Sequence, residues 1–261
     1  MTRTILITGG SSGIGLSTAK LFADRGWIVY ELSRHGSDSE GINHIACDVS
    51  NPESVQKAVQ EVFARTNHLD VVISNAGYGI SGPIEFTDIN DAHHQFDVNF
   101  FGAVHLTQAV LPYLRQQGYG HIIFTSSVAA VLSIPYQAFY SATKAAINAY
   151  ALALHNELRE WHIKVSVLMP GDVATGFTKA RKKDQAGAEI YTHMNAAVSA
   201  MEKDEQTGIA SSRMAKQLYA IAQKKHPHPQ YIGGGKYKIF CLLDRLLPKH
   251  LVNWIVGQLY S

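Results

Sequence analysis

The sequence contains few cysteines and no long apolar run. Its only cysteines are Cys47, at the end of an expected strand, and Cys241, in an apolar stretch near the C-terminus. This usage favours reduced thiols in a cytoplasmic protein over a disulfide framework. No stretch of about 18 apolar residues could span a membrane. The apolar N-terminus is too short for a signal peptide, so we expect a cytoplasmic chain.

The sequence also lacks an excess of charge of either sign. Its 23 Lys and Arg residues stand against 21 Asp and Glu residues. Nucleic-acid-binding proteins usually carry a strong basic excess, so we expect no nucleic-acid partner. There are 13 histidines, including the pairs His93-His94 and His226-Pro227-His228. Neither pair belongs to a convincing ligand set, and we predict no metal site.

The order of apolar segments predicts the fold class. No repeat, low-complexity run or long linker divides the 261 residues, so we expect one domain over 1–261. Strands are expected at 3–8, 27–33, 43–47, 69–74, 120–126, 164–169 and 230–232, and helices at 16–25, from 52, at 89–117 with a kink at Pro112, and at 140–160. This alternation predicts an α/β fold, a doubly wound parallel sheet of about seven strands with helices on both faces.

A glycine-rich turn follows the first expected strand directly. It reads Gly9-Gly10-Ser11-Ser12-Gly13-Ile14-Gly15 and precedes an expected helix. Such glycines let the backbone approach a pyrophosphate, and the helix N-terminus offers free N–H groups and a positive dipole end. The spacing G-x-x-x-G-x-G differs from the common dinucleotide fingerprint. Its place between a strand and a helix is what makes it indicate a dinucleotide site.

Tyr140 and Lys144 lie four residues apart in an expected helix, so their side chains share one face. The ammonium of Lys144 should favour the phenolate form and make Tyr140 a proton donor and acceptor near neutral pH. Ser127, thirteen residues before Tyr140, could hold a carbonyl oxygen at the same place. The pattern Y-x-x-x-K is common, and an ordinary helix with an exposed Lys and a half-buried Tyr is the alternative interpretation.

Taken in order, these motifs resemble the short-chain dehydrogenase/reductase family across nearly the whole chain. The matching segments are 8–15, Asp48-Val49, Ser74-Asn75-Ala76-Gly77, Asn99, Ser127, 140–144 and 170–175. Ser74 is a small departure, because the family usually has a second Asn there. The resemblance implies a single Rossmann-like domain, a nicotinamide cofactor and reversible redox chemistry between a carbonyl and an alcohol.

The resemblance also implies roles for individual residues. Tyr140 would be the general acid, Ser127 would orient the carbonyl, and Lys144 would tune Tyr140 and hold the nicotinamide ribose. The backbone at Asn99 would anchor a water that relays protons. Strand alternation separates Ser126 from Ser127, and the spacing to Tyr140 favours Ser127. The expected cofactor contacts are Gly9, Ser11, Ser12, Gly13, Ile14, Gly15, Ser33, Arg34, Asp48, Val49, Asn75, Ala76, Gly77, Tyr140, Lys144, Pro170, Gly171, Val173 and Thr175.

The end of the second expected strand bears on the choice of cofactor. NAD enzymes generally place a carboxylate there, but the position falls on Ser33 and is followed by Arg34. A guanidinium can clamp a 2′-phosphate, and Ser12 could add a hydroxyl. Glu31, two residues earlier, is the rival carboxylate, and a solvated loop cation is the alternative for Arg34. We therefore predict NADPH in preference to NADH.

The segment 175–208 is expected to cover the substrate. Its cations Lys179, Arg181, Lys182 and Lys183 could attract an anionic substrate, although a solvated loop face is favoured. An apolar wall, or else a packing or dimer contact, is expected from Val131, Leu132, Ile134, Pro135, Tyr136 and Phe139. We predict a hydrophobic carbonyl or alcohol substrate, such as a steroid, a retinoid or a lipid ketone.

The C-terminal tail, 236–261, is longer than a minimal fold of this kind needs. Two apolar, helical pieces flank Pro248. Such tails resemble those of family members that act on steroids, retinoids or acyl-dihydroxyacetone phosphate. The tail could make peripheral membrane contact, form a lid over the pocket, or pack on the protein or a partner subunit; the last two are together favoured. We also expect a homo-oligomer, a dimer or a tetramer.

Two alternative functions remain at this point. One is a non-catalytic nucleotide-binding sensor or scaffold, because fold alone does not imply catalysis. The presence of Asn99, Ser127, Tyr140 and Lys144 together disfavours it. The other is a membrane-surface enzyme of the acyl-dihydroxyacetone-phosphate reductase type.

Overall fold

The computed structural model describes residues 2–260, and its central element is a seven-stranded sheet in the order β11-β7-β6-β4-β1-β2-β3. All six pairings in it are parallel. The strands are β1 (Thr4–Thr8), β2 (Ile28–Ser33), β3 (Ile42–Ala46), β4 (Val71–Ser74), β6 (Gly120–Thr125), β7 (Ile163–Pro170) and β11 (Gln230–Gly233). Each expected strand is present. The order reverses between β1 and β4, as in a doubly wound sheet, so the predicted fold class is confirmed.

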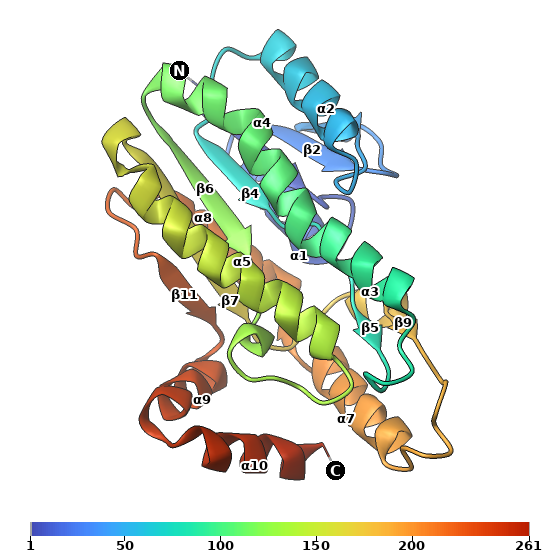
Figure 1. Cartoon of the computed structure of the whole chain (residues 1–261). Helices are drawn as coiled ribbons and strands as arrows, with labels where there is room; N and C mark the ends of the chain where they lie inside the picture. The colour runs from blue at the N-terminus through green and yellow to red at the C-terminus, as the bar shows by residue number, and fades with distance from the viewer. Residues whose placement is uncertain (1, 261) are drawn as a thin grey trace.

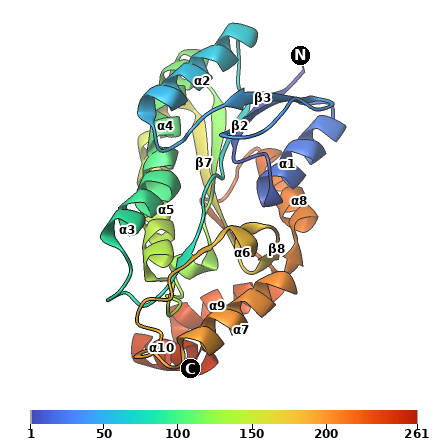
Figure 2. The same cartoon turned by 90° about the vertical axis from the view of Figure 1, so that its right-hand side faces the viewer.

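Helices cover both faces of this sheet (Figures 1 and 2). One face carries α1 (Gly13–Asp24) and α8 (Ser211–Ala222), and the other carries α2 (Pro52–Arg65), α4 (Gly102–Gln117) and α5 (Ala138–Glu157). Strand β1 shows how the sequence builds both cores: Ile5 and Ile7 are buried with α1 and α8, while Leu6 is buried with α2, α4 and α5. Successive side chains of a strand point to opposite faces, so a wholly apolar strand serves two cores.

The long helix expected over 89–117 is interrupted, but not at Pro112. It consists of α3 (Ile89–Phe96), a π-helical turn η1 (Asp97–Phe101) and α4, which contains Pro112 in its interior. In the π turn the amide of Gly102 donates to the carbonyl of Asp97, five residues back. The extra residue in this turn carries Asn99 inward, where it is buried. Insertions of this kind often occur at functional sites.

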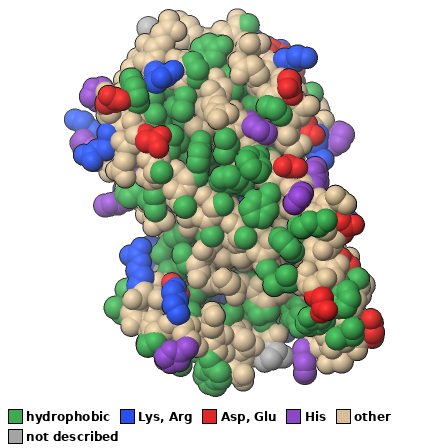
Figure 3. Space-filling view, viewed as in Figure 1, with side chains coloured by type: hydrophobic (Ala, Val, Ile, Leu, Met, Phe, Trp, Pro, Cys, Tyr) green, Lys and Arg blue, Asp and Glu red, His purple; other side chains and the backbone are tan. Residues whose placement is uncertain are grey.

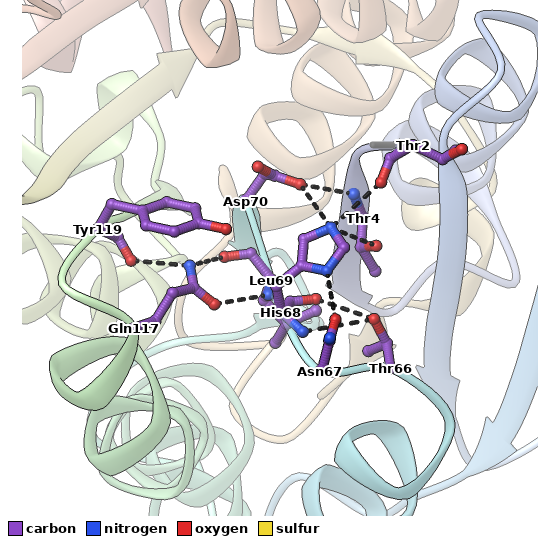
Figure 4. A network of polar contacts seen from close by, with 9 residues as sticks. All are labelled: Thr2, Thr4, Thr66, Asn67, His68, Leu69, Asp70, Gln117 and Tyr119. Carbon is purple, nitrogen blue, oxygen red and sulfur yellow. Dashed lines mark hydrogen bonds and ion pairs between the residues drawn. The ribbon is translucent and has the colours of Figure 1, made fainter.

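The start of β4 is fixed by polar contacts at the end of the sheet opposite to the glycine turn (Figure 4). The carboxylate of Asp70 accepts the amide of Thr4 at 2.7 Å, and His68 lies 3.6 Å from the same oxygen. The side chain of Gln117 brackets Leu69, accepting its amide at 3.0 Å and donating to its carbonyl at 2.8 Å. These contacts join β1, β4 and the end of α4.

Beyond the carboxyl ends of the strands lies a group of smaller elements (Figures 1 and 2). They are β5 (Ile80–Ser81), β8 (Val173–Ala174), α6 (Phe177–Ala180), β9 (Lys182–Lys183), α7 (Met194–Gln206), β10 (Ile209–Ala210), α9 (Gly235–Leu246) and α10 (Lys249–Leu259). The four short strands form two small sheets that the sequence did not predict. Over residues 2–260, no helix has the length and apolar character needed to cross a bilayer.

Candidate active site

A cleft of about 750 Å³ opens at the carboxyl ends of the strands. It is lined by the glycine turn after β1 and by the segments that follow β2, β3, β4, β6 and β7. The cleft lies where the strand order reverses, which is where open α/β sheets bind their ligands. All expected site residues line it except Gly15 and Asn99.

The glycine turn gives the cleft an anion-binding floor. Gly9 and Gly13 have φ of +67° and +53°, a region that favours glycine. Ser12 is the N-cap of α1, but its side chain makes no capping bond, so the first N–H groups of the helix remain available. Gly15 has a packing role instead. A Cβ there would lie 2.1 Å from the carbonyl oxygen of Gly9.

The segments after β2 and β4 form the next part of the wall. Ser33 and Arg34 line the cleft, and Arg34 is exposed. The rival carboxylate, Glu31, is buried, lies 2.5 Å from Nδ1 of His44 and does not line the cleft. A Cβ at Gly10 would lie 2.3 Å from the Glu31 side chain, so this glycine makes room for it. Glu31 is therefore part of the fold rather than of the cleft wall.

Asn75 joins the ends of two neighbouring strands. Its amide donates to Oγ1 of Thr8 at 3.0 Å, and its Nδ2 donates to the carbonyl of Thr8 at 3.2 Å. Ala76 and Gly77 follow and line the cleft, as do Asp48 and Val49 after β3. Cys47 also lines the cleft, which the sequence did not predict. Both cysteines are free, and burial raises the pKa of the Cys47 thiol to about 11.

Ser126 and Ser127 point to different surroundings, as strand alternation predicts. Oγ of Ser126 donates to the carbonyl of Lys144 at 3.0 Å and is buried. Oγ of Ser127 accepts the amide of Ala129 at 3.1 Å and is hydrogen-bonded to Tyr140. The three candidate groups Ser127, Tyr140 and Lys144 all line the cleft.

The electrostatics of the Tyr140–Lys144 pair differ from the expectation. Burial raises the pKa of Tyr140 to about 12, and the hydrogen bond from Ser127 opposes this shift. Lys144 instead donates to the carbonyl of Thr125 at 3.0 Å, and its Nζ lies 5.7 Å from the centre of the Tyr140 ring. The prediction that Lys144 sets the pKa of Tyr140 is wrong for this structure, because burial of the phenol dominates. Burial also lowers the pKa of Lys144, to about 8.

Asn99 lies behind the cleft wall rather than in it. Its Oδ1 accepts the amide of Tyr78 at 2.9 Å, and its Nδ2 donates to the Tyr78 carbonyl at 2.9 Å and to Oγ1 of Thr143 at 3.2 Å. A Cβ at Gly77 would lie 3.1 Å from Oδ1 of Asn99 and 3.6 Å from Nζ of Lys144. Gly77 therefore lets the loop after β4 lie close to both residues.

The loop after β7 closes the opposite wall. Pro170, Gly171, Val173 and Thr175 line the cleft, and Thr175 lies beside Gly13, where a Cβ would be 3.4 Å from its Cβ. A Cβ at Gly171 would lie 2.0 Å from the Tyr237 ring, so α9 packs directly on this loop.

The family assignment rests on a family match, two sequence relatives and one solved structure. The family described as short chain dehydrogenase matches residues 3–186. The chain is 38% identical over 262 residues to the 3-ketodihydrosphingosine reductase of Bacteroides thetaiotaomicron, covering 98% of this chain and 97% of that protein. It is 30% identical over 237 residues to dehydrogenase/reductase SDR family member 7B of Mus musculus, covering 85% of this chain and 71% of that protein. A solved short-chain dehydrogenase of Streptomyces avermitilis superposes with a TM-score of 0.83 at 25% identity, covering 99% and 97% of the two chains.

This chain belongs to the short-chain dehydrogenase family. It is therefore an NAD(P)-dependent dehydrogenase or reductase that acts on a small molecule.

The cleft of this short-chain dehydrogenase fits a nicotinamide dinucleotide. The glycine turn presents free helix N–H groups to a pyrophosphate, and Arg34 stands at the end of β2, where the adenosine ribose of such a cofactor would lie. Thr125, in the cleft wall, has a buried hydroxyl without a hydrogen-bond partner among the described residues. Over residues 2–260, no cluster of three or more His, Cys, Asp or Glu side chains could hold a metal ion.

The basic cluster in the segment 175–208 is mostly neutralised by carboxylates. Arg181 is buried and pairs with Glu205, and its NH1 lies 3.9 Å from Glu202. Lys183 also pairs with Glu202, at 2.7 Å, and Lys182 pairs with Asp91. The predicted solvated face is therefore wrong for Arg181, and the ion pairs leave little charge to attract an anionic substrate.

Side chains that the sequence did not single out complete the cleft near Tyr140. Phe177 of α6 lies with its ring centre 5.5 Å from that of Tyr140. Gln137 and Glu205 also line the cleft. Of the expected apolar wall, Ile134 lines the cleft, and both Ile134 and Tyr136 pack against the Met194 cluster of α7. The positions of Phe177 and Glu205 depend on the path of the chain after β7, and those of Ile134 and Gln137 on the loop between β6 and α5. No local sequence pattern predicts either path.

Proposed function

We propose that this short-chain dehydrogenase uses NADPH to reduce the keto group of a long-chain lipid. The observation that carries the proposal is that Ser127, Tyr140 and Lys144 line the same cleft as the glycine turn. The lipid class is supported by the 38% identical relative, which is named 3-ketodihydrosphingosine reductase and matches 98% of this chain. Ile134 and Phe177, which line the cleft with Tyr140, add apolar surface for such a substrate.

In the proposed reaction, Ser127 and Tyr140 would both act on the carbonyl oxygen of the substrate. Bound NADPH would supply the hydride for the carbonyl carbon. Ser127 would hold the carbonyl oxygen, and Tyr140 would give its proton to that oxygen. A phenol with a pKa of about 12 is almost fully protonated at neutral pH, which suits an acid acting in the reductive direction.

Lys144 and Asn99 would support Tyr140. The ammonium of Lys144, which lines the cleft, would hold the hydroxyls of the nicotinamide ribose. The backbone at Asn99 would anchor a water through which protons return. The π turn places Asn99 beside Gly77, which is itself next to Nζ of Lys144.

Arg34 and Ser12 would select NADPH. Both line the cleft, Arg34 at the end of β2 and Ser12 at the N-terminus of α1. A guanidinium binds a phosphate more strongly than it binds a neutral ribose hydroxyl, because both partners are charged. Glu31 would not repel the 2′-phosphate from the cleft wall, since it is buried against His44.

The proposal is tested by following the oxidation of NADPH and NADH with a panel of ketones. The panel holds 3-ketodihydrosphingosine, a steroid, a retinoid, an acyl-dihydroxyacetone phosphate and a short aromatic ketone. We expect the highest kcat/KM with NADPH and the long-chain keto lipid. Equal turnover with NADH would refute the cofactor choice, and preference for the short ketone would refute the lipid class. Nucleotide binding without turnover of any ketone would favour the sensor alternative.

We further propose that the enzyme is a cytoplasmic homo-oligomer, either a dimer or a tetramer. Light scattering on the purified protein measures the oligomeric state directly, and a monomer at micromolar concentration would contradict the proposed oligomer.

A further inference from the structure

The C-terminal helices α9 and α10 carry most of the large hydrophobic side chains that are exposed among the described residues. Among the described residues, fifteen large hydrophobic side chains are exposed, and nine of them lie on these two helices. The helices lie at one end of the molecule, beyond the carboxyl ends of the strands (Figure 1). In the space-filling view, hydrophobic side chains reach the surface there beside Lys and Arg (Figure 3).

Helix α9 has an apolar stripe on the side that faces away from the protein. The side chains of Ile239, Leu242, Leu243 and Leu246 follow the spacing of one helix face and are 59%, 54%, 41% and 70% exposed. Such a stripe normally faces the core. In α9, however, it is Tyr237 and Cys241 that are buried, so the helix has a second apolar face that the chain itself leaves uncovered.

Helix α10 repeats this arrangement. Val252 and Val256 are buried, while Leu251, Trp254 and Ile255 are 36%, 62% and 38% exposed. Trp is well suited to a membrane interface, because its ring is apolar and its N–H is polar. We define the uncovered faces of α9 and α10 together as the tail face.

The charges around the tail face are mainly positive. Residues 235–259 contain Lys236, Lys238, Arg245 and Lys249, and a single carboxylate, Asp244, which accepts a hydrogen bond from Lys249 at 2.7 Å. Lys238 and Arg245 are exposed and seven residues apart, so they flank one side of the α9 stripe. Long basic side chains beside an apolar face can extend toward lipid headgroups.

We propose that the tail face binds the surface of an anionic lipid bilayer. The helices have 12 and 11 residues, too short to cross a bilayer and suited to lying in its interface. The positive charge complements anionic headgroups. A symmetric contact between two copies of the same face would instead bring the cations of both copies together, which argues against a second copy as the occupant.

The tail face is joined to the wall of the cleft. Tyr237 of α9 packs on Gly171 and donates a hydrogen bond to Asp172, and both of these residues line the cleft. Tyr260, after α10, packs against Met194, Val198 and Met201 of α7. Docking would thus bring the cleft close to the bilayer, from which a lipid substrate could enter. Only the entry of a lipid substrate from the bilayer rests on the proposed function; the docking itself does not.

Co-sedimentation of the full-length protein with vesicles tests the docking without any measurement of activity. One vesicle type contains phosphatidylcholine alone, and the other also contains phosphatidylglycerol. We expect binding to the anionic vesicles that weakens with added salt. Lys238→Gln with Arg245→Gln should weaken it roughly 25-fold, since each cation near an anionic surface contributes roughly fivefold. Leu243→Ser with Leu246→Ser should weaken it about tenfold or more, through lost apolar burial.

The matched control is Ile84→Ser with Ile89→Ser, which removes two apolar side chains of 64% and 59% exposure outside the tail. This control should bind vesicles like the wild type, and circular dichroism should show all variants folded. The proposal is overturned if neither vesicle type is bound, if both are bound equally, or if the tail variants bind like the control. It is also overturned if the Leu variants turn an oligomer into a monomer while vesicles are not bound, because the tail face is then a contact between copies.

Discussion

The side chain of Ser126 donates a hydrogen bond of 3.0 Å to the main-chain carbonyl of Lys144. This bond joins the end of β6 to helix α5, which carries Tyr140. Both serines line the cleft, but the hydroxyl of Ser127 is hydrogen-bonded to Tyr140 rather than to the main chain of α5. The Ser126 hydroxyl thus has a structural partner, whereas the Ser127 hydroxyl lies beside Tyr140, where we propose that it holds the carbonyl oxygen.

Replacing each of these serines by alanine should separate the two roles. Ser126→Ala should lower the free energy of unfolding by about 0.5–1.5 kcal/mol, because it removes a buried hydrogen bond while the Lys144 carbonyl keeps its helical partner within α5. Ser127→Ala should lower kcat/KM by about 10²–10³-fold, because a group that holds the reacting oxygen is lost, and should cost about 0.5–2 kcal/mol of stability through the lost bond to the Ala129 amide. Urea unfolding and steady-state kinetics measure the two effects. The division of roles fails if both variants lose activity equally.

Tyr140→Phe should abolish most of the reductase activity. Removing a general acid typically costs about 10²–10⁴-fold in rate, and the ring contact with Phe177 is retained. Tyr150→Phe is the matched control, since Tyr150 lies on the same helix and contacts Phe100 and Phe124 rather than the cleft. Comparable kcat/KM for the two variants would mean that Tyr140 is not the proton donor.

The activity should fall as the pH rises through about 8. Burial lowers the pKa of Lys144 from 10.5 to about 8, so its ammonium is lost above that pH. The same shift makes the folded state bind fewer protons than the unfolded state between about pH 8 and 10.5, so this group favours folding more as the pH rises there. An NMR titration of the lysine amines, with Lys144→Met to assign the signal, measures the pKa in the cofactor-free protein. A value near 10.5 would contradict the prediction.

Much of the fold follows from local sequence patterns, which is why all seven strands and the glycine turn were predictable. Periodicity could not locate the break in the helix over 89–117. Pro112 suggested one position, yet α4 runs through it. The π turn lies at Asn99, whose side chain is held by the backbone of Tyr78 and by Thr143. Those partners are distant in sequence, so no local signal could indicate the turn.

The partners of charged side chains are also distant in sequence, so local patterns do not predict their surroundings. Glu31 and Arg181 both looked like candidates for the site or the solvated surface, yet each is buried with a partner far along the chain, His44 and Glu205 respectively. The pairing of these charges depends on the packed structure, and so does the pKa of a half-buried group such as Tyr140. Residue type and spacing were enough to name the candidate site but not its electrostatics.

Arg34→Asp should reverse the cofactor preference. The change removes a cation that would pair with the 2′-phosphate and adds a carboxylate that repels it and accepts ribose hydroxyl bonds. We expect the ratio of kcat/KM for NADPH to that for NADH to fall by about 10²-fold or more, since a charge-assisted bond worth about 1.5–3 kcal/mol is replaced by repulsion. Arg25→Asp, at an exposed arginine beside Tyr219, is the control. An unchanged ratio in Arg34→Asp would show that another group selects the cofactor.

His121 should make the protein sensitive to acid. It is buried in β6, where its Nε2 lies 3.0 Å from Oγ of Ser166. Burial, and then the nearby Lys164 and His155, lower its pKa from 6.5 to about 3. Between these values the unfolded state binds the extra proton, so the stability that the neutral ring contributes is complete above pH 6.5 and is lost progressively as the pH falls toward 3.

His121→Gln removes this titration while keeping an N–H for Ser166. Urea unfolding between pH 4 and 7 should therefore show a shallower loss of stability in His121→Gln than in the wild type. His226→Gln, at an exposed histidine, should follow the wild type. If the free energy of unfolding falls with the same slope in all three proteins, the imidazole of His121 takes up no proton on unfolding. Carboxylates alone would then account for the loss of stability in acid.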